Sequence, residues 1–443
     1  MSTENFQLFN DFIPRKYVFA FFAFIRGLRT RGFLHANIEN LLYTETGKDT
    51  IIVFLTTGVN IFIAGLFFVF APRILGPSDF GIFATVVATG ILAINVANFG
   101  IDSGILRFVS GKEKNNPYLA LAFKAYLVLG LLTAGMGFLI SPLLANLLGY
   151  SQITPLLRIA FISTIFILFT NFYVAALQAR KEFVKASLVN ISSNLSKLVI
   201  LAITAVFFSI GLYLITIIFF FTTIISVIVG KVLLPFELKS KSVKNPLVFL
   251  NYNLWIALSL IIASIPLDNY FLLKSAGASQ TGLYAAPFKI LTFVYQFAGN
   301  FTRVLAPRFT SFDTKEKTRV FAFKSFGIVV IMSAFLIVLA VVGVPIISLV
   351  FGSSFSGSAE IFRILTLGFI FFFAGTVPSA IILYYFGKSQ VTFFITALRF
   401  VVFVALLYFL VPKMQAVGAA VSYSLAEGVT FLLLAIYSLW RLK

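Results

Sequence analysis

The chain has 443 residues, of which 60% are hydrophobic and only 11% are charged. Soluble domains are about 45–50% apolar and about 25% charged, so this composition excludes a soluble globular protein and predicts a polytopic membrane protein. The formal net charge is +19, and the absence of cysteine excludes disulfides, thiol nucleophiles and cysteine-bound metals. The single histidine, His35, gives no basis for a metal site or a catalytic triad.

The first 50 residues precede the first long apolar stretch. Residues 17–25, YVFAFFAFI, are apolar but too short to cross a bilayer, and basic residues flank them on both sides. Arg26 follows directly, where a signal peptide would have small residues for cleavage. We therefore expect residues 1–50 to be a cytoplasmic extension with an interfacial helix on the inner leaflet, and an unstructured basic tail is the alternative.

Twelve stretches beyond residue 50 are apolar enough to cross a membrane, since a span needs about 20 residues. They are predicted at 51–72, 80–101, 119–141, 155–178, 187–208, 211–234, 251–273, 284–306, 323–350, 361–386, 391–411 and 416–440. Most of the 34 Lys and Arg residues lie in the N-terminal tail, in the loops after even-numbered spans and at the C-terminus. This bias predicts that both termini are cytoplasmic.

Two short stretches follow the same pattern. GPSDFGIFA (76–84) joins the first two predicted spans, and GASQTGLYA (277–285) joins the seventh and eighth. After each of them come an RFxS pattern, a proline and a glycine seven residues apart, and an arginine, in the same order and at a nearly constant offset. We interpret this order as an internal duplication of six spans.

Two copies of six spans have the same orientation in the membrane, because six is an even number. The predicted fold is therefore an all-α membrane protein with twelve transmembrane helices in two parallel six-helix lobes, an N-lobe at 51–240 and a C-lobe at 241–443. Two such lobes enclose a cleft where transporters bind substrate, and rocking of one lobe against the other gives alternating access.

Three motifs also resemble those of a known family. They are RILGPSDFGIFA after the first span, PLDNYFLL with GLYAAPFKI across the seventh and eighth spans, and VGAAVSYSLAE in the twelfth. In this order, over residues 51–440, the chain resembles the Wzx-type flippases of O-antigen and capsule units, which belong to the MATE-like MOP exporter superfamily.

The resemblance implies a V-shaped pair of lobes in a bacterial or archaeal cell (inner) membrane. It implies transfer of undecaprenyl-diphosphate-linked oligosaccharide from the inner to the outer leaflet, without a cofactor but coupled to an H⁺ or Na⁺ gradient. Besides this substrate and membrane lipids, the partners it suggests are the polysaccharide polymerase and glycosyltransferases of the same pathway.

Charged side chains inside predicted spans are candidate site residues, because a charge at mid-bilayer costs about 2.5–3.5 kcal/mol on insertion scales. Asp268 in the seventh span and Lys289 in the eighth lie at one depth on adjacent helices, so we expect an ion pair between them. The pair either pins this hairpin or serves transport, with Lys289 on a substrate phosphate and Asp268 in ion coupling.

Four further charges, Lys197, Arg303, Arg399 and Glu427, also lie inside spans. The interior basic residues outnumber the two acids, as a diphosphate would require, because Arg binds phosphate in a bidentate way and Lys acts as a point charge. Pairing with another helix is the alternative for each. The residues predicted to bind the diphosphate and the sugar are Lys289, Arg303, Lys197 and Arg399. Those predicted to serve ion coupling or ion pairing are Asp268 and Glu427.

No enzyme motif is found in the sequence, neither a P-loop nor a Ser/His/Asp set nor a metal cluster. We therefore expect a transporter with no catalytic residues, no metal site and no nucleic-acid partner. Three alternatives stay open. The first is a MATE-type cation-coupled multidrug efflux pump, which a basic cleft disfavours. The second is a membrane glycosyltransferase or polymerase, which would need a large soluble loop or a carboxylate cluster. The third is a lipid II flippase, but that family normally has fourteen spans.

Overall fold

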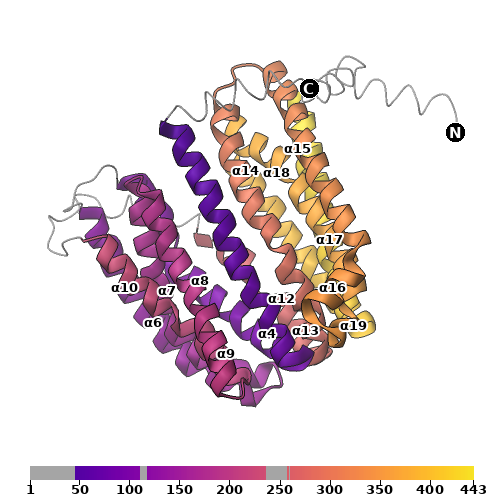
Figure 1. Ribbon diagram of the computed structural model, residues 1–443. Coiled ribbons are helices and arrows are strands. Elements are labelled where there is room, and N and C mark those ends of the chain that lie inside the picture. Colours follow the sequence, from indigo (N-terminus) through magenta and orange to yellow (C-terminus); the bar gives the residue numbers. More distant parts are fainter. Residues whose placement is uncertain (1–44, 110–116, 236–256, 259) are drawn as a thin grey trace.

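The computed structural model describes residues 45–109, 117–235, 257–258 and 260–443 (Figure 1). Every regular element in these residues is a helix. The expected interfacial helix at 17–25 and the boundary between the predicted lobes at 240/241 lie outside the described residues. The division into 1–50, 51–240 and 241–443 therefore stays a prediction.

The N-terminal half begins with a 54-residue helical stretch, α4 (Glu45–Asn98), which starts before the first expected span. The other elements of this half are α5 (Ile101–Phe108), α6 (Pro117–Leu147), the 3₁₀ turn η1 (Ser151–Ile153), α7 (Thr154–Ala179), α8 (Phe183–Phe207), α9 (Leu212–Phe221) and α10 (Thr223–Leu233).

The C-terminal half ends with a second 54-residue stretch, α19 (Ser389–Leu442). The elements before it are α12 (Leu267–Ser275), α13 (Ala278–Leu291), α14 (Phe293–Thr310), α15 (Lys315–Val341), α16 (Gly343–Phe351), the 3₁₀ turn η2 (Ser353–Phe355), α17 (Ser358–Ala374), α18 (Thr376–Ala380) and the π-helix η3 (Ile381–Tyr385).

The stretch α4 is a hairpin of two spans. Its backbone is non-helical at Gly76 (φ 68°, ψ 175°). The ring centroids of Phe67 and Phe83, on opposite sides of this glycine, are 6.2 Å apart. In a straight helix they would be about 24 Å apart, at 1.5 Å per residue. The chain therefore reverses its direction at Gly76.

The stretch α19 reverses in the same way at Gln415 (φ 49°, ψ −127°), since Arg399 and Glu427 on its two arms form an ion pair at 2.6 Å. Eight described helical segments are long and apolar enough to cross a membrane, and α4 and α19 hold two spans each. The two other expected spans correspond to α12, before which the chain is only partly described, and to α13 with α14. The prediction of twelve helices is confirmed.

Large apolar side chains cover the outside of the helices. Leu139, Val206 and Leu349, for example, are 77%, 76% and 75% exposed. Each such side chain gains about 1.5–3 kcal/mol when it leaves water for an apolar environment, so this surface is stable in lipid. The chain is a multi-pass membrane protein.

Several expected spans are interrupted where continuous helices were predicted. The breaks include those at Thr222, Thr292, Val342 and Gly375. The Thr222 hydroxyl donates to the carbonyl of Ile218 at 2.8 Å, and the Thr292 hydroxyl donates to the carbonyl of Lys289 at 2.6 Å. Bonds of this kind compete with the backbone ladder and bend a helix, which hydropathy alone does not reveal.

The two halves repeat each other in backbone geometry as well as in sequence. Gly76 and Gly277 have φ 68° and 88° with ψ 175° and 171°. Gly149 and Gly352 also share positive φ, 79° and 91°, and a 3₁₀ turn follows each of them. Positive φ is open to glycine at little cost. The same turns in the same order confirm two equivalent lobes.

The lobes touch at the end where the repeated turns lie, shown at the bottom of Figure 1, and their ribbons diverge towards the other end. A Cβ atom at Gly81 would overlap the carbonyl oxygen of Ala278, and one at Gly282 would overlap that of Pro77. The two contacts are equivalent, because Pro77 and Ala278 each follow the positive-φ glycine of their hairpin. The backbones of α4 and α13 thus pack directly together, which only glycine permits.

Side chains extend this contact between the lobes. The Arg73 guanidinium, on α4, donates to the backbone carbonyls of Leu349 and Val350 at the end of α16, at 2.7 Å to Val350. The Tyr150 hydroxyl accepts a hydrogen bond from the backbone N–H of Ala278 at 3.0 Å. We call the glycine contact and these hydrogen bonds the interlobe seam.

Candidate functional site: the cavity between the lobes

A cavity of about 1110 Å³ lies between the lobes. On the N-lobe side it is lined by the second arm of α4, through Ala84, Ala88, Ile91 and Asn95. The rest of the lining comes from the C-lobe, from the residues before α12 through to α19. Ligand sites commonly measure about 300–1,000 Å³, so the cavity can hold a sizeable polar headgroup.

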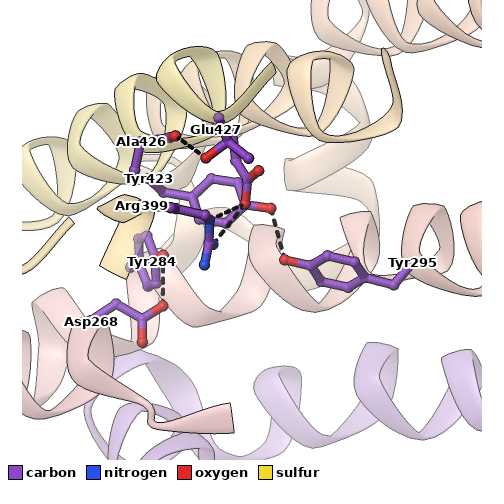
Figure 2. A network of polar contacts seen from close by, with 8 residues as sticks. Asp268, Tyr284, Tyr295, Arg399, Tyr423, Ala426 and Glu427 are labelled. Carbon is purple, nitrogen blue, oxygen red and sulfur yellow. Dashed lines mark hydrogen bonds and ion pairs between the residues drawn. The ribbon is translucent and has the colours of Figure 1, made fainter. Parts of the chain in front are cut away.

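Arg399 and Glu427 form an ion pair on the C-lobe wall (Figure 2). The Nε and Nη2 atoms of Arg399 both donate to Oε1 of Glu427, at 2.9 and 2.6 Å. The Glu427 side chain is 4% exposed and that of Arg399 is 20% exposed. Each charge offsets the desolvation of the other, so the α19 hairpin carries both without an isolated buried charge. Pairing between helices, the alternative named for both residues, is what the structure shows.

Asp268 is held by a tyrosine instead of the expected lysine. The Tyr284 hydroxyl donates to Oδ2 of Asp268 at 2.8 Å, and the backbone N–H of Asn269 donates to Oδ1 at 2.8 Å. Among the described residues no ion pair joins Asp268 to Lys289, although the two charges are close enough to attract each other. The predicted ion pair is therefore wrong. The Lys289 ammonium lies instead over the ring of Phe68 in the N-lobe, 5.3 Å from its centroid.

Aromatic side chains form a continuous surface beside these charges. The hydroxyls of Tyr295 and Tyr423 are hydrogen-bonded at 2.7 Å (Figure 2). The ring of Phe288 lies 5.4 Å from that of Tyr423 and 5.6 Å from that of Tyr284, centroid to centroid. Flat rings with hydroxyl groups at their edges suit a sugar, which offers an apolar face and a ring of hydroxyls.

Lys289 is a cavity cation that forms no direct ion pair with an acid of the described residues, although the Asp268 carboxylate lies near it. It lines the cavity on α13, and among the described residues no ion pair or hydrogen bond involves its ammonium group. A cation over an aromatic ring gains about 0.5–2 kcal/mol, and bonds between charged groups are stronger than neutral ones when well placed. An anionic group entering the cavity can therefore displace the ammonium from Phe68.

Lys197 lies apart from the other predicted site residues. It is on α8 of the N-lobe, and it is not among the residues that line the described cavity. Its Nζ donates to Oδ1 of Asn194 at 3.1 Å and lies 4.6 Å from the ring centroid of Phe219. Asn194 in turn donates to Asn60 at 2.8 Å. Its charge is thus satisfied within the N-lobe, and its role in substrate binding stays a prediction.

Arg303 belongs to α14, but its side chain lies outside the described residues, so its predicted role is also open. The described lining carries two acids and two bases, namely Asp268, Glu427, Lys289 and Arg399. Acids and bases are equal in number in this described lining, and the expected surplus, which also counted Lys197 and Arg303, stays a prediction. Glu427 neutralises Arg399, and the carboxylate of Asp268 lies near Lys289.

The tyrosines of the cavity were missed in the sequence. The chain has 56 Phe but only 16 Tyr. A tyrosine inside an apolar span carries a hydroxyl that needs a partner, so Tyr284, Tyr295 and Tyr423 are informative for the same reason as a charge. The sequence could have identified these three tyrosines as candidate site residues. It could not have shown which hydroxyls are hydrogen-bonded to each other.

The described residues contain no group of His, Cys, Asp or Glu that could hold a metal ion. What the cavity offers is binding chemistry: an unpaired cation, a buried ion pair, hydroxyls and aromatic faces. Ser, Thr and amide side chains at its edge add further hydrogen-bonding groups, among them Asn95, Asn269, Thr292, Gln296 and Thr376.

The family model of "Polysaccharide biosynthesis protein" matches residues 69–360. The "Putative O-antigen transporter" of Shigella flexneri is 25% identical over 393 residues, which cover 82% of this chain and 91% of that protein. Among solved structures, an inward-facing multidrug resistance MATE family transporter of the MOP superfamily matches with a TM-score of 0.73 and 14% identity, covering 88% of this chain and 98% of that one.

The lipid II flippase MurJ in an inward closed conformation matches with a TM-score of 0.67 and 16% identity, over 89% of each chain. At these identities the two structures establish the fold alone. The matching curated relative is described as a transporter, which agrees with the expectation that this chain is a transport protein and not an enzyme. The resemblance inferred from the motifs is confirmed, and the chain belongs to the polysaccharide biosynthesis protein family, with the Wzx-type flippases.

Proposed function

We propose that this protein is a flippase that moves an undecaprenyl-diphosphate-linked oligosaccharide from the inner to the outer leaflet by alternating access. The observation that carries the proposal is the cavity between the lobes, where an unpaired cation lies beside tyrosine hydroxyls. A diphosphate and a sugar cannot enter hydrocarbon unaided, because their polar groups would lose water without replacement. This lining replaces that water, while the prenyl chain stays in lipid.

Each cavity residue has a proposed role. Lys289 binds a phosphate as a point charge, and Tyr295, Tyr423 and Gln296 bind sugar hydroxyls. Arg399 is held by Glu427 at the edge of the same surface and keeps free N–H groups for the substrate, because both of its described bonds go to one carboxylate oxygen. Arg303 and Lys197 are further candidates for contacts made as the lobes move.

Asp268 and Glu427 are the proposed sites of ion coupling, to H⁺ or Na⁺. Beside the Asp268 carboxylate, the side-chain oxygen of Asn269 is buried and makes no hydrogen bond with the described residues. A buried oxygen without a donor is costly, and a proton carrier or a small cation would satisfy it. Binding of the ion and binding of the substrate would then favour different positions of the lobes.

The proposed setting is the inner membrane of a bacterial or archaeal cell, with both termini in the cytoplasm. The basic residues of the loops support this orientation. The proposed partners are membrane lipids and the enzymes that make and polymerise the repeat unit, namely glycosyltransferases and a polysaccharide polymerase.

The test is reconstitution of the full chain into vesicles that contain undecaprenyl-diphosphate oligosaccharide, with the exposed fraction scored by a glycosidase added outside. We expect translocation above that of empty vesicles. Lys289→Ala should lower the rate at least about tenfold, which is about 1.4 kcal/mol in the free-energy barrier, and Lys289→Arg should keep part of the rate. Lys413→Ala, at an exposed lysine, is the matched control. Translocation no faster than in empty vesicles would refute the proposal.

A MATE-type cation-coupled multidrug efflux pump is the second candidate. The two carboxylates of the cavity, Asp268 and Glu427, favour it, because cationic drugs bind next to acids. The same vesicles loaded with a cationic dye separate the candidates. Dye export that depends on Glu427, in vesicles that do not translocate the oligosaccharide, would favour the pump.

A further inference from the structure

Two helix faces at equivalent positions of the two lobes line the cavity. In the N-lobe the face is Ala84, Ala88, Ile91 and Asn95 on the second arm of α4, spaced by three and four residues as one side of a helix requires. At the equivalent positions after Gly277, the C-lobe presents Ala285, Lys289, Thr292 and Gln296, and all four also line the cavity. We call these the N-face and the C-face.

The two faces share a position but not a chemistry. Only the first position is the same residue, alanine, and it lies nearest the interlobe seam. At the next two positions the N-face has Ala88 and Ile91, and the C-face has Lys289 and Thr292. The N-face is therefore apolar at the positions where the C-face is charged and polar. Only the last position is polar on both faces, with Asn95 and Gln296.

The rest of the described lining follows the same division. All four charged side chains of the lining, and the three tyrosines with hydrogen-bonded hydroxyls, are on C-lobe elements: Asp268, Tyr284, Lys289, Tyr295, Arg399, Tyr423 and Glu427. From the N-lobe, the ring of Phe68 lies beneath the Lys289 ammonium.

We propose that the C-lobe alone recognises the charged and hydroxylated headgroup, and that the N-face is an apolar wall that moves past it. This inference rests on the proposed function and assigns its recognition to one lobe. The headgroup stays bound to the C-lobe when the lobes rock, and specificity for the glycan is set by the C-face and by Tyr295 and Tyr423.

The physical reason is the work of separating the lobes. Each hydrogen bond that a substrate makes to both lobes must be broken when they part, and an unmatched buried polar group costs about 1–3 kcal/mol. The side chains of Ala84, Ala88 and Ile91 can make no such bonds, so these positions of the N-face can leave the headgroup without that penalty. Lys289 likewise loses only the ring contact with Phe68 when the N-lobe moves away.

The equivalence of the faces allows the cation to be moved from one to the other. The double variant Ala88→Lys with Lys289→Ala keeps one lysine in the cavity but places it on the N-face. Binding of farnesyl diphosphate, used as the anionic probe, is measured on the purified full chain in detergent by its thermal stabilisation. The single variant Ala88→Lys, which leaves the C-face intact, controls for folding.

We expect Lys289→Ala to weaken binding of the probe at least about tenfold, and the double variant to bind as weakly as Lys289→Ala. Ala88→Lys alone should bind like the unmodified protein. Wild-type affinity in the double variant would overturn the inference, because a cation on either face would then serve equally.

A second pair of variants tests the sugar contacts at one depth. Gln296→Ala should lower translocation of the oligosaccharide in vesicles, and Asn95→Ala, at the equivalent position of the N-face, should lower it less. Equal losses from both would refute one-sided recognition while the unmodified protein still translocates. Failure of the unmodified protein to translocate would instead count against the proposed function.

Discussion

Each lobe begins with a helical hairpin, in α4 for the N-lobe and in α12–α13 for the C-lobe. The two hairpins have the same backbone geometry but different buried side chains. Both reverse at a glycine with positive φ, Gly76 or Gly277, and both pack through a glycine of the following helix, Gly81 or Gly282. The interlobe seam constrains this backbone, because any side chain at these two glycines would collide with the opposite carbonyl.

The interiors differ at equivalent depths on the two arms. In the N-lobe, Phe67 and Phe83 are buried against each other, with ring centroids 6.2 Å apart. At the equivalent positions of the C-lobe, Asp268 accepts a hydrogen bond from Tyr284 at 2.8 Å. An aromatic pair gains about 0.5–1.5 kcal/mol beyond its buried area and needs no partner, whereas a buried carboxylate is tolerated only with donors.

The comparison shows that a duplicated fold can keep its packing contacts and change its interior chemistry one pair at a time. Each change has to replace both members, because a carboxylate opposite a phenylalanine, or a lone tyrosine hydroxyl, would be unsatisfied. One lobe thereby becomes the binding lobe, and the other keeps an apolar interior at these two positions.

We expect the largest effect from disrupting the glycine contact at the interlobe seam, which both hairpins share. Gly81→Leu should reduce translocation in vesicles to the background, because the side chain would prevent the lobes from meeting at the seam. Phe355, in the C-lobe, is buried against Phe80, the N-lobe residue next to Gly81 of the seam. Because the chain has no cysteine, Phe355→Cys reports opening of the seam by labelling with a maleimide. Labelling should be faster in Gly81→Leu.

Gly65→Leu on the first arm of α4 is the matched control, since a Cβ there meets no atom within 4 Å. It should translocate at close to the normal rate. Equal loss in both variants would mean that leucine harms α4 in general, and normal transport in Gly81→Leu would contradict the role of the seam.

The second prediction concerns variants in which the C-lobe pair, Asp268 and Tyr284, is changed towards the N-lobe pair, Phe67 and Phe83. Tyr284→Phe alone leaves Oδ2 of Asp268 without its hydrogen-bond donor and should lower the free energy of unfolding by about 1–3 kcal/mol. The double variant Asp268→Phe with Tyr284→Phe should recover stability, because neither polar group is left unpaired, but it should lose transport. Thermal unfolding in detergent and the vesicle assay measure the two effects separately.

Matched variants in the other lobe sharpen this result. Phe83→Tyr would place a hydroxyl beside Phe67 with no carboxylate to accept from it, and should destabilise the protein without adding function. If the double variant of the C-lobe still transports, Asp268 and Tyr284 serve only the hairpin and not the transport cycle.

The smallest effect is expected at the edge of the seam. Arg73→Gln removes the charge that contacts the carbonyls at the end of α16. A cation at a helix C-terminus contributes about 0.3–1 kcal/mol at an exposed site. Labelling of Phe355→Cys should therefore rise only a few-fold. Lys274, the exposed residue at the equivalent position of the C-lobe hairpin, provides the control Lys274→Gln, and an equal rise there would contradict a specific contact.

Sequence reasoning went furthest where the signal is local. The sequence itself shows twelve apolar stretches and the repeated glycine turns. These two patterns together predict two lobes with a cleft between them. The charges were found as well, because an ionised group in an apolar span is rare. Their partners were not found, since Asp268 bonds to Tyr284 and Arg399 to Glu427 across hairpins.

By itself, the sequence determined the membrane fold, the number of spans and the duplication, because hydropathy and glycine turns act over a few neighbouring residues. Only the tertiary structure decided that Gly81 and Gly282 form the contact between lobes, that Lys289 lies over Phe68 without a direct ion pair, and that Lys197 lies away from the cavity. A buried charge takes the partner that helix packing brings within reach, and packing joins residues far apart in the chain.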